Sequence, residues 1–344
     1  MKHLNIFLIT LLLACTSTIK AQSFSSAVEY LDFIAEQQED VTKNMWKYTK
    51  AIAHGKSDRS VNNKRNALLK TLEKAINNIK KAQGFDGTEY KGQVLDHMRL
   101  NESLLKHDYA KIIDMKEVAE QSYDLMEAYI LAQEMADKKM EEAQLEYEIN
   151  MHKFAAKHNV QLVETENDLS KKMKISNEVF GHYNAMYLAF FKVHINQIYL
   201  WDAMKSNDVS AIQQNSNALN QMAKASMETI NSIETYKNDK SVIEATKKVF
   251  QFYIDETENT IPKITDFFLL NEDFETIKST LDKTPQSKRT QEQIDAYNNK
   301  VKEFNKGIES YNKVNQNLNV ASQRALDNLN KANENFLARH IPND

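Results

Sequence analysis

The stretch Ser176–Ser206, SNEVFGHYNAMYLAFFKVHINQIYLWDAMKS, is the most aromatic run in the chain and decides the fold class. Around residues 186–191 little polar surface is left on any side of a helix built from it. A helix that is apolar nearly all round is buried on more than one side. The stretch therefore predicts a central helix around which other helices pack. Its main apolar face is formed by Val179, Tyr183, Met186, Phe190, Val193 and Trp201.

The composition predicts an all-α protein. Only 6 Gly and 3 Pro occur in 344 residues, which leaves little material for the turns of a many-stranded sheet. Apolar residues make up 42% of the chain, and they recur at helical spacing. A chain of this length is enough for about two domains. The formal net charge of −4 predicts no basic face for nucleic acid.

Residues 1–21 read as an export signal. The apolar run from Leu4 to Ala14 follows a charged start and is too short to span a bilayer. Two processing sites compete, namely cleavage after Ala21 and lipidation of Cys15 in the lipobox-like sequence Leu12-Leu13-Ala14-Cys15. Leu13 is larger than the residue usual at that lipobox position, so the soluble product is favoured.

The same segment contains the only cysteine and indicates the expected compartment. Cys15 is the only cysteine, so an intramolecular disulfide and a cysteine zinc site are excluded. No later stretch is long and apolar enough for a membrane span, which makes a lipid on Cys15 the one expected membrane contact. We expect an exported protein of the periplasm, the cell surface or the medium.

Hydrophobic stripes separated by stop signals predict a succession of helices. Gly84-Phe85-Asp86-Gly87 and Asn207-Asp208 are typical turn and cap sequences, and Asp58 or Ser60 is expected to cap the second helix. A bend or turn is expected at residues 114–116, and Pro262 predicts a break near Ile264. The predicted helices with defined bounds cover residues 25–53, 165–205, 273–281 and 290–338, and further stripes extend over 61–79, 90–112, 118–154, 212–233 and 242–261.

The last predicted helix carries an unbroken heptad repeat. Six heptads without a slip are typical of a left-handed coiled-coil seam. Packing against the helix over 165–205 of the same chain is favoured over a seam for another chain. The seam positions are Ile294, Val301, Ile308, Asn315, Ser322, Leu329 and Phe336, alternating with Tyr297, Phe304, Tyr311, Leu318, Ala325 and Ala332.

Short sequence echoes link the two halves of the chain. Asn66-Ala67-Leu68 recurs as Asn217-Ala218-Leu219, and Lys111-Ile112-x-Asp114 recurs as Lys263-Ile264-x-Asp266, at offsets of 151 and 152 residues. These echoes favour an internal duplication. The predicted architecture is thus two tandem antiparallel helical bundles, over residues 24–160 and 165–342, with long coiled-coil-like helices.

One constellation could hold a metal ion in the bundle interior. Glu148/His152 and Glu178/His182 are each four residues apart, so each pair lies on one helical face. If the two helices are antiparallel across residues 157–164, the pairs lie at similar heights and could bind zinc or iron. Two ordinary surface pairs are the favoured interpretation, and no cofactor is expected.

The remaining candidate residues favour packing over chemistry. His194 is expected to be a buried or half-buried, hydrogen-bonded histidine rather than a ligand. The aromatic cluster around Phe190 is expected to be core, with a small-molecule pocket as the alternative. No nucleophile elbow, phosphate-binding glycine loop, dinucleotide fingerprint or His-Glu-x-x-His motif occurs, so we expect no enzyme.

The start of the predicted mature chain carries a family resemblance. Tyr30-Leu-Asp-Phe-Ile-Ala35, followed by Asn44-Met-Trp-Lys-Tyr-Thr-Lys-Ala-Ile-Ala-His-Gly-Lys56, resembles an uncharacterised family of all-helical bacterial surface proteins of spirochaete and Bacteroidetes-type envelopes. The resemblance implies a surface or envelope location and assigns no site residues.

The sequence thus predicts an exported, non-catalytic helical surface protein that acts by binding or scaffolding. Its partner is an unidentified protein or envelope ligand. The alternative is a ligand- or metal-binding bundle of the ferritin-like or sensor-like type.

Overall fold

The computed structural model describes residues 22–54, 57–163 and 168–343, and these fold into helices with no strand among them. The predicted all-α class is therefore confirmed. The predicted signal segment, including Cys15, lies outside the described residues. The long helices are α1 (Ala27–His54), α2 (Asp58–Lys81), α3 (Glu89–Ser103), α4 (Tyr109–Ala119), α5 (Tyr123–Lys157), α6 (Asp168–Ser206), α7 (Val209–Thr229), α8 (Ser241–Asp255), α9 (Ile261–Lys283) and α10 (Gln291–His340).

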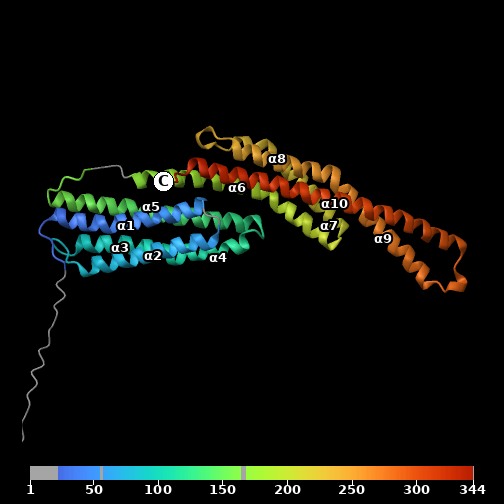
Figure 1. The fold of residues 1–344 in the computed structure, drawn as a ribbon, viewed down its shortest axis with the longest axis horizontal. Coiled ribbons are helices and arrows are strands. Elements are labelled where there is room, and N and C mark those ends of the chain that lie inside the picture. Colours follow the sequence, from blue (N-terminus) through green and yellow to red (C-terminus); the bar gives the residue numbers. More distant parts are fainter. Residues whose placement is uncertain (1–21, 55–56, 164–167, 344) are drawn as a thin grey trace, which may run out of the picture.

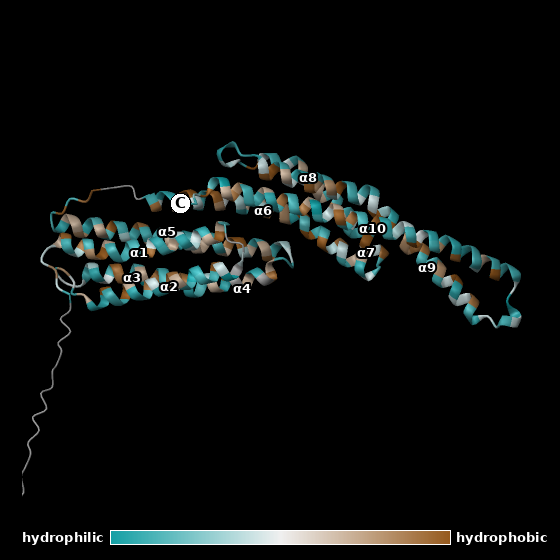
Figure 2. Ribbon diagram, in the orientation of Figure 1, coloured by the Kyte–Doolittle hydropathy of each residue, from teal (hydrophilic) through white to brown (hydrophobic). Residues whose placement is uncertain are grey.

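Two hydrophobic cores follow one another along an elongated molecule (Figure 1). The first core lies between α1, α2, α3 and α5 and includes the fully buried Tyr30, Leu72 and Met98. The second core lies among α6 to α10 and includes Phe191 and Phe250. Figure 2 shows hydrophobic residues on the faces that the helices turn towards one another. None of the described helices has both the length and the apolar character that a bilayer span requires.

The two bundles are joined by a packed junction at one end of the first. Trp46 of α1 and Met126 and Ile130 of α5 are buried in the second core, not in the first. Lys50 Nζ donates to the carbonyl oxygen of Asn343 at 3.0 Å, which ties α1 to the end of the chain. The aromatic stretch forms most of α6, which passes from beside the first bundle into the second (Figure 1).

Side-chain caps start several helices where the sequence places polar residues. The Asp208 carboxylate accepts from Ala211 N at 2.9 Å, and Thr290 forms a reciprocal capping box with Gln293. The second helix is capped by Ser57 rather than by Asp58 or Ser60. The expected bend at residues 114–116 is also displaced, because α4 continues to Ala119 and the Ser122 cap then starts α5.

A π-helical turn interrupts each half of the molecule. The turns are η1 (Leu104–Asp108) and η4 (Glu256–Thr260), and each follows a helix of 15 residues. The break expected near Ile264 is wrong, because Pro262 lies in the first turn of α9, where a missing N–H costs little. The separate helix expected over 273–281 is likewise wrong, since α9 runs unbroken to Lys283.

The heptad helix α10 packs within the chain, but its main neighbours are α9 and α8 rather than α6. The Tyr311 ring stacks on Phe267 with ring centroids 4.4 Å apart, and the Phe304 ring stacks on Phe274 at the same separation. Further along α10, Leu329 and Phe336 enter the second core. The expected partner is therefore wrong, because α7 is the main neighbour of α6 and occupies much of its apolar surface.

Candidate functional site: a buried polar cluster in the second core

The structure does not bring together the four residues that the sequence grouped as a metal site. Glu148 of α5 accepts a hydrogen bond from Gln144 at 2.9 Å, whereas the His182 ring of α6 lies against Phe336 of α10, with centroids 5.4 Å apart. Across the described ranges, no group of three or more His, Cys, Asp or Glu side chains is arranged to hold a metal ion. The physical reason is register, because α6 runs back beside the N-terminal half of α5 (Figure 1), where Tyr183 approaches Tyr129 and the Tyr199 hydroxyl donates to the Gln121 carbonyl. His182 therefore lies level with the start of α5 and far from His152 near its end.

A cluster of hydrogen bonds around Asp239 lies near His182, at one end of the second bundle. Asp239 Oδ2 accepts from His340 Nε2 at 2.7 Å and from Arg339 Nη2 at 2.8 Å, and Asp239 Oδ1 accepts from Ser241 N. Burial alone would raise the pKa of Asp239, but these hydrogen bonds outweigh it and lower the pKa well below its ordinary value. This cluster therefore holds the end of α10 against the start of α8.

The strongest candidate site surrounds Glu256, the first residue of the π-turn η4. Its side chain is 2% exposed, which is unusual for a carboxylate. Gln197 Nε2 of α6 donates to Glu256 Oε1 at 3.0 Å, and Gln197 is itself buried. The Trp201 indole, one helical turn further along α6, also lies near this carboxyl. No lysine or arginine salt bridge to Glu256 occurs among the described residues.

Burial controls the charge of Glu256. It raises the pKa of this carboxyl from 4.5 to about 7, and the Gln197 amide and the Trp201 indole only partly offset that effect. Gln197 Oε1 and Trp201 Nε1 have no hydrogen-bond partner of normal geometry. Glu256 is thus a buried acid that exchanges its proton near neutral pH.

His194 and Tyr253 form a second polar pair one turn away from Gln197. His194 Nδ1 and the Tyr253 hydroxyl are 2.6 Å apart, and the imidazole stacks on Phe190. Burial lowers the pKa of His194 to about 4 and raises the pKa of Tyr253 well above its ordinary value, so both groups are neutral at pH 7. This result confirms the expectation of a hydrogen-bonded histidine in the core.

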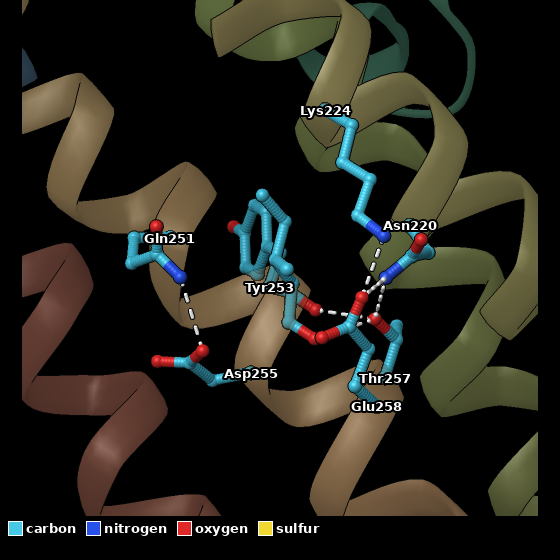
Figure 3. A network of polar contacts seen from close by, with 8 residues as sticks. Asn220, Lys224, Gln251, Tyr253, Asp255, Thr257 and Glu258 are labelled. Atoms are coloured by element: carbon cyan, nitrogen blue, oxygen red, sulfur yellow. Dashed lines mark hydrogen bonds and ion pairs between the residues drawn. The ribbon is translucent and has the colours of Figure 1, made fainter.

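The outer side of the π-turn is held by polar contacts from α7 (Figure 3). The Thr257 hydroxyl donates to the Tyr253 carbonyl at 2.8 Å and accepts from Asn220 Nδ2 at 2.8 Å. Lys224 pairs with the exposed Glu258 at 2.6 Å. In η1 of the first half, Arg65 of α2 plays a comparable part, donating to the Leu105 carbonyl at 2.7 Å. Each π-turn is therefore anchored by a side chain from a neighbouring helix of its own half, α2 for η1 and α7 for η4.

The Glu256 carboxyl can hold and release a proton within the second core. A hollow between neighbouring helices of this core has none of Glu256, Gln197 and Trp201 in its lining. That hollow encloses about 390 Å³ between α6, α7 and α8, with Met222, Ile230 and Phe250 on its apolar side and Lys192 among its polar lining. Phe190 and Phe191 are buried in the core, which agrees with packing as their role.

The first core has a smaller polar site at His97. This buried ring stacks on Tyr147, and His97 Nδ1 lies 3.0 Å from the Ala143 carbonyl oxygen. Burial lowers the pKa of His97. The hollow beside it encloses only about 150 Å³, which is small for an organic ligand.

Glu256 was missed because it lies in the polar run Asp255-Glu256-Thr257-Glu258, which resembles an exposed helical turn. One signal could have found it. Val242, Val249 and Glu256 are seven residues apart, so Glu256 occupies the next position of an apolar stripe. A charged residue at a core position is a better marker of a buried site than the spacing of histidines.

Comparisons with known proteins add no assignment to this geometry. No protein-family model matches the chain, and no match is found among curated proteins or among solved structures.

Proposed function

We propose that the chain is an exported helical protein that acts by binding or scaffolding in the cell envelope or at the cell surface, without catalysis. The signal-like residues 1–21 support export. The elongated arrangement of two bundles supports a binding role, because it exposes long helical faces (Figure 1).

One exposed surface carries the proposal. Four large apolar side chains of α5 point away from the first core, and each is more than half exposed: Leu131, Met135, Leu145 and Ile149. We call this row the α5 stripe. Single exposed apolar residues need no explanation, but four large ones on one helix face are typical of an interaction surface.

Photocrosslinking in cells that naturally make the protein tests the binding role. A photoreactive residue at Leu145 is expected to give covalent protein adducts, because a partner covers the α5 stripe. The control is Val320 of α10, which is also about half exposed and has polar neighbours along its helix. Adducts from neither position, or equal adducts from both, would contradict a specific surface at the stripe.

The N-terminus of the isolated protein tests export and anchoring. Mass spectrometry is expected to find Gln22 as the first residue, and Cys15→Ala is expected to leave membrane partitioning unchanged. A lipidated Cys15 would contradict the soluble product while leaving export intact. A chain that retains residues 1–21 would contradict export itself.

We also infer that the two halves arose by duplication. The π-turns support it, because they start at residues 104 and 256, which are 152 residues apart and match the offset of the Lys-Ile-x-Asp echo. The 15-residue helices before them add to this support. Homologous chains whose halves align with each other at no common spacing would contradict the inference.

A further inference from the structure

The α5 stripe lies on the side of its helix that faces away from the buried residues. Ala136, Ala143 and Tyr147 face the first bundle and are less than 9% exposed, whereas the four stripe residues are 53–54% exposed. At 100° per residue, the mean direction of the stripe is about 140° from that of the buried row. The stripe is therefore available to a partner without any rearrangement of the bundle.

The order of residues along this face is symmetrical. From its N-terminal end the face reads Leu131, Met135, Lys138, Glu142, Leu145, Ile149, in steps of four, three, four, three and four residues. These are the steps of a coiled-coil seam. Two apolar residues thus lie on each side of a central Lys–Glu pair, whose Nζ and Oε1 atoms are 3.9 Å apart and whose side chains are both exposed.

We propose that the α5 stripe binds the α5 stripe of a second copy of this chain, in an antiparallel, two-fold symmetric pair. The inference rests on the proposed function and names the partner of that surface. A two-fold contact uses the same patch on both copies, so the patch must be complementary to itself. Reversal of this face about its centre places Leu131 against Ile149, Met135 against Leu145 and Lys138 against Glu142.

Charge distinguishes this arrangement from a parallel one. The antiparallel pair brings each Lys138 to the Glu142 of the other copy, whereas a parallel pair would place Lys138 on Lys138 and Glu142 on Glu142. Lys139 and Glu141 beside the centre keep the local charge balanced, although Lys139 also pairs with Asp108 of its own chain at 3.0 Å. The centre therefore fixes both direction and register.

Repulsion between like charges at the edge of the interface opposes pairing. Glu134 of one copy would approach Glu148 of the other at the solvent-exposed rim. Like charges at such a rim are screened by water and salt, so their repulsion is small compared with covering four half-exposed apolar side chains on each copy. The contact from residue 131 to residue 149 would extend over about 27 Å of helix.

Sedimentation of the chain from Gln22 onward, which contains every described residue and no cysteine, tests the pairing. The wild-type chain is expected to dimerise with increasing concentration. Leu145→Glu is expected to raise the dimer Kd by roughly tenfold or more, because a two-fold symmetric interface contains the Leu145 contact twice. Val320→Glu, the matched exposed control, is expected to leave the Kd unchanged. A wild-type chain that stays monomeric, or equal Kd values for both variants, would overturn the proposal.

Two cysteine variants test direction and register without relying on affinity. Leu131→Cys and Ile149→Cys, each oxidised alone, are expected to stay uncrosslinked, whereas their mixture is expected to give a disulfide-linked dimer. Crosslinking of either variant with itself would indicate a parallel or shifted pair and overturn the proposal. Adducts from Leu145 to a different protein, with a monomeric pure chain, would also overturn self-pairing while leaving the binding role intact.

Discussion

Replacing Glu256 by Gln is expected to raise the free energy of unfolding by about 3 kcal/mol at pH 7 and above, and by close to nothing near pH 4.5. The wild-type carboxyl is buried with its pKa raised to about 7, so at higher pH the folded chain must hold either a buried charge or a costly proton. An amide stays neutral at every pH. Gln197 Oε1, which has no partner, can accept from the new amide.

The sign of the pH dependence follows from the raised pKa. The stability that neutral Glu256 contributes is fully present below pH 4.5 and is lost as pH rises to about 7. His194 acts in the opposite direction, because burial lowers its pKa from 6.5 to about 4 and its contribution is lost as pH falls through that range. In the wild-type chain the two effects largely cancel between pH 4.5 and 6.5. In Glu256→Gln the His194 effect is expected to remain, and the buried His97, whose pKa is also lowered, adds to it in the same direction.

Chemical denaturation at a series of pH values measures both effects. The control is Glu258→Gln, which removes an exposed carboxylate two residues away that pairs with Lys224. An exposed ion pair of this kind contributes about 0–1 kcal/mol, so this variant should differ little from the wild type across the series. If the free energies of unfolding of Glu256→Gln and the wild type differ by the same amount at every pH, the pKa of Glu256 is not raised by folding, which would contradict the prediction.

Replacing Trp46 by Ala is expected to cost about 3–5 kcal/mol and to separate the unfolding of the two cores. Trp46 is 4% exposed and, although it belongs to α1, it is buried in the second core. Trp46 is the largest of the buried side chains that the first half contributes to this core, beside Ala119, Met126 and Ile130, so its loss would leave a cavity at the junction. Trp201, which lies beside Glu256, would then be the single tryptophan and would report on the second half alone.

Comparison of Trp201 fluorescence with far-ultraviolet circular dichroism during denaturation detects the separation. The wild-type chain is expected to show coincident curves by the two methods, and Trp46→Ala is expected to show two steps. Tyr48→Ala is the matched control, because Tyr48 lies two residues away on α1, is 6% exposed and packs in the first core. Coincident curves for Trp46→Ala would show that other contacts couple the bundles.

Most helix positions could be predicted from the sequence because their signals are local. Turn residues such as Gly84 and caps such as Asp208 mark chain reversals, and the seven-residue repeat of the last helix persists over its full length. The π-turns could not be predicted, since a π-turn and an α-turn have similar compositions. The π-turn also explains why Pro262 causes no break. It makes Ile261 the start of α9, and a proline is well tolerated in the first turn of a helix.

The candidate site was harder to predict than the fold. Glu148, His152, Glu178 and His182 were grouped by spacing within two helices, but spacing does not determine how those helices meet. The buried, hydrogen-bonded state of His194 could be predicted, because the sequence around it is apolar on nearly every side of its helix. The burial of Glu256 could be predicted from its place in the Val242–Val249 stripe, but its partner Gln197 depends on how α6 packs against the α8–η4 segment, which that spacing does not determine.

The π-turns have a consequence for which insertions and deletions the chain can tolerate. Each contains one residue more than an α-turn, so the helix that follows leaves it rotated by roughly 100° compared with an uninterrupted helix. In α9 that rotation directs Ile261, Ile264 and Phe268 inward. Loss of the exposed Asn259 would turn all three towards water, whereas a residue lost from the exposed stretch 285–288 only shortens a connection. Length variation among natural relatives should therefore accumulate at 285–288 and spare residues 256–260.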